Sequence, residues 1–502
     1  MESNRLTKLF IRNLFLRIVI ISFLFISCHQ KSDVGKFETQ LFPFELPEGI
    51  IDGKDVIYGY VIVPESHKNQ DDKTMKIAVA KFKSHNEKPS PEPLLLLSGG
   101  PGESNITSFT KLMGTELGKM LLEKHDIVLI DVRGTYYSQP NLHCPEVFEC
   151  EKELQKLDMK SDETFAFMLE SVQKAHQRFL NEGINLSVFN NFEIASDIDM
   201  VMKVLNYKKY NVFGFSAGTL TAQYLLKNYS ESLHAVIMTA IVDIEENLAA
   251  SNSNTIETME KIFRICETEE KYKQAYPDLE NRFLQMLDSL NETPVKVEMK
   301  DQEGESYAYN ITGDKIARWL TFGMYWNSQL PVTINKLLNN DFSDFIATIN
   351  NATPQETFSH GLGYSIMASE FVNGFSKSYS YNSKYETLHN GLKTAWHSPQ
   401  FNKKMAEIWK VDKIQPDDLP ITSDVPTLML CGEYDHVCPP KYANKIAKGL
   451  SNSYLYIFKG MTHSQVSNTS CLPQMLKEFI NDPSKAPNSA CVNEINSEFI
   501  LP

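Results

Sequence analysis

The sequence predicts an α/β fold built on a mostly parallel sheet, with a helical domain inserted late in the chain. Eight strand-like segments recur, and several are continuous apolar runs of the kind found in strands buried on both faces. Helix-like stretches such as Ile194–Leu205 and Ala217–Asn228 lie between several of them, an alternation typical of parallel sheets. This rhythm stops between the sixth and seventh segments, where the chain is read as helices and loops.

The expected strands are all short and apolar or alternating: 55–64, 75–83, 93–98, 126–131, 209–214, 234–239, 425–431 and 453–458. We expect 29–245 and 415–502 to form the sheet domain and 246–414 to form a helical cap without a buried strand. An insertion at this point would lie over the carboxyl ends of the strands, where open α/β sheets bind ligands.

The net negative charge of the chain limits the classes of molecule that it could bind. The 502 residues carry a formal net charge of -14. Nucleic-acid binding depends on Lys and Arg contacts to phosphates, so the acidic balance argues against a nucleic-acid partner.

The N-terminus is predicted to be a targeting segment. Several Lys and Arg residues precede the apolar run Ile18–Ile26, which is followed by Ser27 and Cys28. The segment LFISC resembles a bacterial lipobox, so we expect 1–28 to be a lipoprotein signal peptide with Cys28 as the lipidation site. That would place the protein in the cell envelope, on a membrane, facing the periplasm or the outside. An uncleaved anchor or ordinary cleavage to a soluble periplasmic form are the alternatives.

Export makes disulfides possible. The chain has eight cysteines, at positions 28, 144, 150, 266, 431, 438, 471 and 491. We expect Cys471 and Cys491 to pair, because this bridge would pin the C-terminal tail, and Cys144 with Cys150 is the next candidate. No pair has C-x-x-C spacing and no His cluster accompanies the cysteines, so no metal site is expected.

The stretch VFGFSAGTL at 212–220 carries a candidate nucleophile. Gly214 and Gly218 flank Ser216 in a G-x-S-x-G pattern, between an expected strand and an expected helix. A nucleophile elbow needs this strand–turn–helix context and small neighbours. The alternative is a tight turn in which the serine only caps the helix.

Two further residues would complete a catalytic triad in the chain order of this arrangement, serine, acid and histidine. Asp435 follows the seventh expected strand, and His463 follows the eighth. The same edge of the sheet would present both. Glu433 is the rival for the acid and His436 is the rival for the base.

The loop after the third expected strand, GGPG at 99–102, is glycine-rich. Its backbone could approach a substrate oxygen closely, so we expect the amides of Gly100 and Ala217 to form an oxyanion hole, with Gly99 as the alternative to Gly100. The loop lacks the G-K-[ST] of a phosphate-binding loop. A plain strand–helix turn is the remaining alternative.

Together these segments resemble the prolyl and tripeptidyl aminopeptidase branch of the α/β-hydrolase superfamily. The matching segments are SGGPG (98–102), DVRGTYYS (131–138), GFSAG (214–218), GEYDHVCP (432–439) and GMTHS (460–464). The region around Cys471 and Cys491 resembles the TAP-like C-terminal region of this branch. The resemblance extends from about residue 55 to the C-terminus.

The resemblance implies an eight-stranded α/β-hydrolase sheet and a serine peptidase that needs no cofactor. It also implies that Glu370, in GYSIMASEF, binds the free amine of a short peptide substrate. Four positions depart from the family pattern. Ser98 stands in place of a His, Tyr136 and Tyr137 stand in place of small residues, and Tyr272 stands in place of a cysteine that would pair with Cys266.

The expected activity is therefore an aminopeptidase that works through an acyl-enzyme on Ser216, with His463 as base and Asp435 as orienting acid. A carboxylesterase or lipase-like enzyme with the same triad is the second hypothesis. A non-catalytic surface-binding lipoprotein is the third.

Overall fold

The computed structural model describes most of the chain after residue 32. The described ranges are 33–69, 73–156, 159, 161–243, 245–246, 251–300, 304–323, 329–351, 356–371, 382–393, 398–414, 421–466, 469–495 and 497–502. The predicted signal peptide and its lipidation site, Cys28, lie outside these ranges. Among the described helices, none combines the length and the apolar character needed to cross a membrane.

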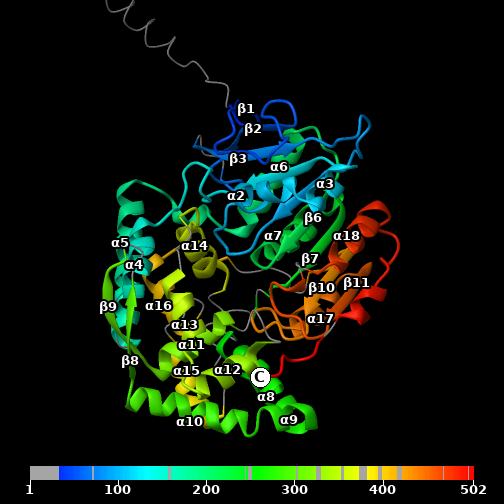
Figure 1. Ribbon diagram of the computed structural model, residues 1–502. Helices are drawn as coiled ribbons and strands as arrows, with labels where there is room; N and C mark the ends of the chain where they lie inside the picture. The colour runs from blue at the N-terminus through cyan, green and yellow to red at the C-terminus, as the bar shows by residue number, and fades with distance from the viewer. Residues whose placement is uncertain are drawn as a thin grey trace, which may run out of the picture.

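A nine-stranded sheet with the order β1-β2-β3-β5-β4-β6-β7-β10-β11 runs through the upper part of the molecule as drawn in Figure 1. Its strands are β1 (Phe37–Gln40), β2 (Val56–Pro64), β3 (Thr74–Phe82), β4 (Leu94–Leu97), β5 (Ile127–Asp131), β6 (Tyr210–Phe215), β7 (Leu233–Thr239), β10 (Thr427–Gly432) and β11 (Ser453–Phe458). The strands from β5 to β11 pair in parallel, and β1, β2 and β3 pair antiparallel at one side.

All eight expected strands are present in this sheet, and β1 corrects the expected count to nine. The strand β1 has four partly exposed residues and pairs with the edge of β2. It depends on backbone hydrogen bonds and carries no apolar pattern that a sequence could reveal.

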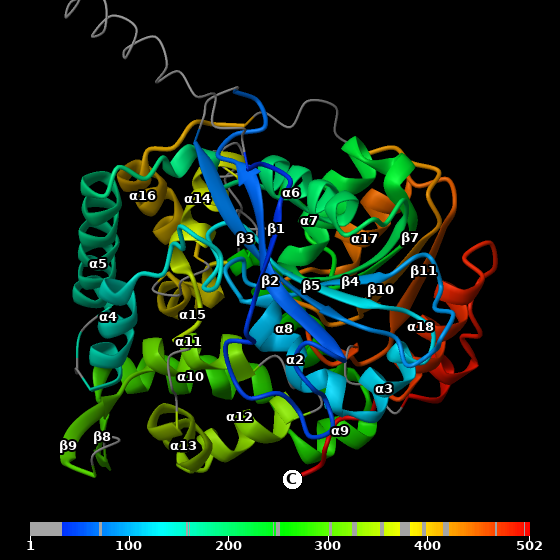
Figure 2. The same ribbon diagram turned by 90° about the horizontal axis from the view of Figure 1, so that it is seen from above.

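Helices cover both faces of the sheet (Figure 2). They are α2 (Asn105–Thr110), α3 (Glu116–Leu122), α6 (Asn191–Val204), α7 (Ala217–Asn228), α17 (Pro440–Ala447) and α18 (Cys471–Asn481). Leu95 and Leu97 pack in the cluster that contains α6, α7 and α17, whereas Leu94 and Leu96 pack in the cluster that contains α3 and α18. This alternation is why the buried strands read as continuous apolar runs.

The predicted cap segment contains nine described helices and one hairpin. The helices are α8 (Ser251–Thr268), α9 (Glu270–Ala275), α10 (Leu279–Glu292), α11 (Gly313–Gly323), α12 (Leu330–Leu338), α13 (Ser343–Asn351), α14 (His360–Glu370), α15 (Glu386–Leu392) and α16 (Pro399–Trp409). The hairpin, β8 (Val295–Lys300) and β9 (Ser306–Ile311), was not expected. It is largely half-buried or exposed, with apolar residues on one face, so it differs from the buried strands sought in the sequence.

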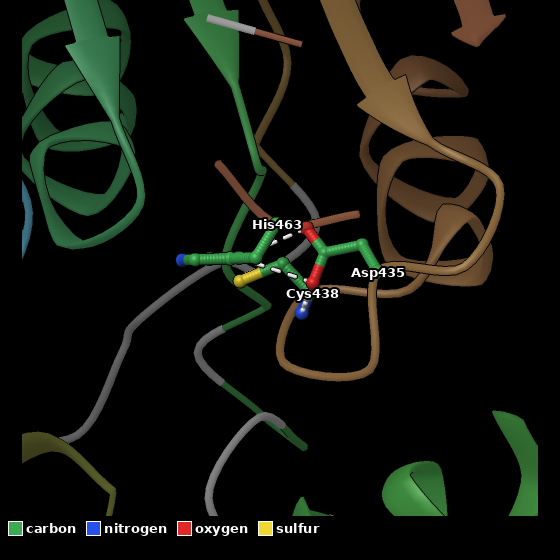
Figure 3. Close-up of side chains that lie close together, drawn as sticks. All are labelled: Asp435, Cys438 and His463. Carbon is green, nitrogen blue, oxygen red and sulfur yellow. Dashed lines mark hydrogen bonds and ion pairs between the residues drawn. The ribbon is translucent and has the colours of Figure 1, made fainter. Parts of the chain in front are cut away.

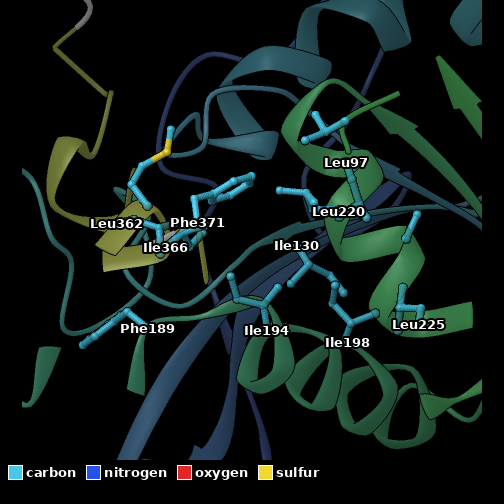
Figure 4. Close-up of a cluster of buried hydrophobic side chains, with 14 of the residues drawn as sticks. Leu97, Ile130, Phe189, Ile194, Ile198, Leu220, Leu225, Leu362, Ile366 and Phe371 are labelled. Carbon is cyan, nitrogen blue, oxygen red and sulfur yellow. The ribbon is translucent and has the colours of Figure 1, made fainter. Parts of the chain in front are cut away.

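Two helices of this segment pack on the sheet side. Helices α14 and α16 join the apolar cluster of α6 and α7, together with α4 (Pro145–Lys156) and α5 (Ser161–Asn181). Figure 4 shows Leu362 and Ile366 of α14 near Ile194 of α6 and Leu220 of α7. These side chains belong to one apolar cluster, so α14 packs against the same cluster as α7, the helix that follows Ser216.

The C-terminal tail joins the cap to the loop after β10. The ring of Phe499 lies 5.2 Å from the ring of Tyr272 and 6.5 Å from that of Tyr434, and the Phe499 amide donates a hydrogen bond to the Tyr272 hydroxyl at 3.1 Å. Tyr276 donates to the carbonyl of Ile500. Tyr272, a departure from the family pattern, therefore holds the tail in place.

We predict that Phe499→Ala lowers the free energy of unfolding by about 3 kcal/mol, because Phe499 is 5% exposed in the cap cluster. Urea denaturation measures the change. The matched control is Leu501→Ala, because Leu501 is 45% exposed on the same tail and should cost less than about 0.5 kcal/mol. Equal effects of the two substitutions would show that the tail does not secure the cap.

Candidate active site

Ser216 lies in a sharp turn between β6 and α7. Its backbone has φ 51° and ψ -120°, a conformation that non-glycine residues rarely adopt. A Cβ at Gly214 would lie 2.8 Å from the carbonyl oxygen of Gly218, and a Cβ at Gly218 would lie 2.6 Å from that of Leu97. Both flanking positions therefore require glycine if the strand and the helix are to meet at this angle.

The structure brings Ser216, His463 and Asp435 together. The Oγ atom of Ser216 lies 3.0 Å from Nε2 of His463, and Nδ1 of His463 lies 2.9 Å from Oδ2 of Asp435 (Figure 3 shows the His463–Asp435 pair). Because the carboxylate can only accept, Nδ1 donates to Asp435, and Nε2 of the neutral ring is left to accept from the serine hydroxyl. This is the tautomer that a general base for Ser216 needs.

Asp435 is held as an ion in a buried place. Burial alone would raise the pKa of Asp435, but the charge of His463, its hydrogen bond and the amide of Cys438 lower the pKa below its ordinary value. The amides of Val437 and Cys438 donate to Oδ1 at 2.9 and 2.7 Å. The carboxylate therefore stays charged and stabilises a protonated His463.

The two rival residues have other settings. Oε2 of Glu433 accepts from the amide of Gly460 at 3.0 Å, which ties the loops after β10 and β11 together. His436 is buried beside Asp435, and the hydrogen bond to the Ser216 hydroxyl is made by His463.

The glycine-rich loop lies beside the serine. A Cβ built at Gly99 would lie 3.2 Å from Cβ of Ser216, and Gly100 has φ 115°, which favours glycine. Gly99 and Ala217 line one small cavity with Leu362 and Ile366 of α14. Ala217 is the first residue of α7, where amides have no partner within the helix. The choice between Gly99 and Gly100 as the second oxyanion donor stays a prediction.

Two polar residues that the sequence analysis did not single out support this loop. Asn105 accepts from the amide and the hydroxyl of Ser98, both at 2.7 Å, and donates to the carbonyl of Ile130. Asp131 accepts from Ser104, Ile106 and Tyr137. Asp131 begins the segment DVRGTYYS that resembles the family pattern, whereas Asn105 lies three residues beyond the segment SGGPG.

The surroundings of Glu370 differ from those expected for a residue that binds the substrate amine. It is buried, and its carboxylate accepts from the amide of Asn191 at 2.7 Å and from the Asn191 side chain at 3.0 Å. Asn191 in turn accepts from the hydroxyl of Thr221 on α7 at 2.7 Å. These contacts place the carboxylate between α6, α7 and α14, so the amine-binding role stays a prediction that they do not favour.

The cysteines divide into one pair and several free thiols in the described part of the chain. Cys471 and Cys491 form a disulfide. Cys144 and Cys150, the second candidate pair, are both buried free thiols, and so is Cys266. Cys144 directly precedes α4 and Cys150 lies within that helix. The expected bridge between them is not formed, which corrects that expectation.

Two family models match the sequence. Residues 92–265 match the model described as alpha/beta hydrolase fold, and residues 396–491 match the model described as TAP-like protein. A search of curated proteins found no match.

The solved structures that match this chain have low sequence identities and low TM-scores. An esterase from Exiguobacterium antarcticum is 16% identical with a TM-score of 0.34, covering 81% of this chain and 96% of its own. The proline iminopeptidase of Mycobacterium smegmatis is 12% identical with a TM-score of 0.36, covering 85% of this chain and 98% of its own. At such scores these likenesses carry no argument about activity.

Glu370 generates a test of stability against pH. Burial raises the pKa of Glu370 from 4.5 to about 7 in the fold, so its contribution to stability is complete below pH 4.5 and is lost as the pH rises through 7. The substitution Glu370→Gln leaves a side chain that is neutral at every pH. The free energy of unfolding of this variant, relative to the wild type, should therefore rise by up to about 3 kcal/mol between pH 5 and pH 8.

Denaturant unfolding at several pH values measures this difference. The exposed Glu386 provides the control Glu386→Gln. If the gap between Glu370→Gln and the wild type is the same at pH 5 and pH 8, Glu370 is not a buried titrating group.

Proposed function

The chain is an α/β hydrolase by fold, and we propose that it is a serine peptidase of the aminopeptidase type that acts through an acyl-enzyme. The observation that carries this proposal is the continuous chain of hydrogen bonds from Ser216 through His463 to Asp435. The family motifs and the match of residues 396–491 to TAP-like proteins support the choice of peptide substrates.

The proposed reaction has two halves. The Oγ atom of Ser216 attacks the substrate carbonyl while Nε2 of His463 takes the hydroxyl proton, and backbone amides of Ala217 and the glycine-rich loop stabilise the oxyanion. The imidazolium then gives its proton to the leaving amine. A water molecule attacks the ester in the same way and releases the acid and Ser216.

A carboxylesterase is the second candidate, and the setting of Glu370 is the observation that favours it. An aminopeptidase needs an anionic group for the free amine of its substrate, and the carboxylate expected to supply it accepts hydrogen bonds from Asn191 within the fold. The triad itself serves either substrate class.

We also propose that the protein acts in the cell envelope, tethered by a lipid on Cys28. The support is the sequence alone, namely the basic residues, the apolar run and the lipobox-like LFISC. Metabolic labelling with a fatty-acid probe would detect the lipid.

We predict that the purified full-length protein cleaves fluorogenic amides of free-amine proline, alanine or tripeptides and spares their N-acetylated forms. The size of the released unit identifies the class of aminopeptidase. Ser216→Ala should lower kcat by at least about a thousandfold, because it removes the nucleophile.

A short acyl ester belongs in the same panel. Activity on the ester alone, or equal activity on blocked and free amides, would contradict the aminopeptidase and support the esterase. A well-folded protein with no activity on the whole panel would leave the surface-binding hypothesis.

A further inference from the structure

Asp435, Cys438 and His463 present three different metal-ligand groups to one another (Figure 3). Asp435 and Cys438 are three residues apart on the loop after β10, and His463 follows β11. One ligand atom from each residue lies within 4.8 Å of the other two, and all three residues are buried. A carboxylate oxygen, a thiolate sulfur and an imidazole nitrogen are the ligands that Zn²⁺ uses in proteins.

The backbone fixes two of these groups in place. The amide of Cys438 donates to Oδ1 of Asp435 at 2.7 Å, and the thiol sulfur of the same residue lies within 4.8 Å of the carboxylate and of the His463 ring nitrogen. Tetrahedral zinc with ordinary bond lengths places its ligand atoms about 3.4–3.8 Å apart. Side-chain shifts of about an ångström would therefore convert this cluster into three arms of a zinc site, with a water molecule as the fourth.

We propose that Asp435, Cys438 and His463 bind Zn²⁺ and that the bound metal switches the hydrolase off. The metal takes a ring nitrogen of His463. Through Nδ1 it replaces the hydrogen bond to Asp435 that orients the ring, and through Nε2 it removes the base that serves Ser216. The thiol proton passes to solvent. Where Nδ1 binds the metal, the ring proton moves to Nε2, so the ring stays a neutral ligand and Nε2 can no longer accept from Ser216.

The ligand set selects the metal. A thiolate and an imidazole favour Zn²⁺, whereas Mg²⁺ and Ca²⁺ prefer six or more oxygen ligands. His463 is 25 residues from Cys438 and 28 residues from Asp435, so a search for C-x-x-C spacing does not detect this cluster.

Inhibition tests the proposal in the full-length protein. Zn²⁺ should inhibit hydrolysis reversibly, EDTA should restore it, and Mg²⁺ at the same concentration should have no effect. Cys438→Ser should raise the half-inhibitory Zn²⁺ concentration at least tenfold, each variant being compared with its own activity without metal. Cys431→Ser is the matched control, since Cys431 is a buried thiol on β10 outside the cluster, and its inhibition should equal that of the wild type.

The inhibitory consequence rests on the proposed hydrolase activity, but metal binding does not, so a second readout separates the two. Titration of Co²⁺ into Ser216→Ala should give the absorption of a thiolate-bound tetrahedral cobalt ion, and the added substitution Cys438→Ser should abolish it. Absence of this absorption, or equal Zn²⁺ inhibition of Cys438→Ser and the wild type, would overturn the proposal. Cobalt binding in a protein that cleaves none of the substrates would overturn the proposed function and keep the metal site.

Discussion

The backbone of Ser216 is held at φ 51° and ψ -120°, and the geometry of the site depends on the contacts that keep it there. Gly214 and Gly218 let β6 and α7 meet with backbone atoms too close for any Cβ. The same turn places Oγ of Ser216 within reach of His463 and starts α7 with its free amides beside the glycine-rich loop. The conformation of this turn thus positions both the proposed nucleophile and the proposed oxyanion donor, the amide of Ala217.

Other parts of the fold place Asp435, His463 and the glycine-rich loop around Ser216. The parallel strands β10 and β11 end side by side, so the loops that follow them bring Asp435 and His463 together although 28 residues separate them. Asn105 and Asp131 hold the glycine-rich loop from below, and α14 packs over it. The ring of Phe499 in the C-terminal tail contacts Tyr434, which precedes Asp435 in the sequence, and also contacts Tyr272 of the cap.

The buried strands and the triad could be predicted because each has a local signal. Strands such as β4 and β10 are buried at every residue, and each triad residue follows a strand end. The edge strand β1 has no apolar signal. The strand β8 of the cap hairpin has a short one, in which Val295, Val297 and Met299 alternate with charged residues. The setting of Glu370 could not be read from sequence, because its partner Asn191 is 179 residues away.

The proposed function depends on Ser216 being a nucleophile that His463 and Asp435 activate. The most direct measurement is labelling with a fluorophosphonate probe, followed by peptide mapping and by the labelling rate. We predict a single adduct on Ser216 and a labelling rate at least about a hundredfold lower in Asp435→Asn, which disturbs the tautomer of His463. An adduct on another residue, or an unchanged rate in Asp435→Asn, would contradict the account.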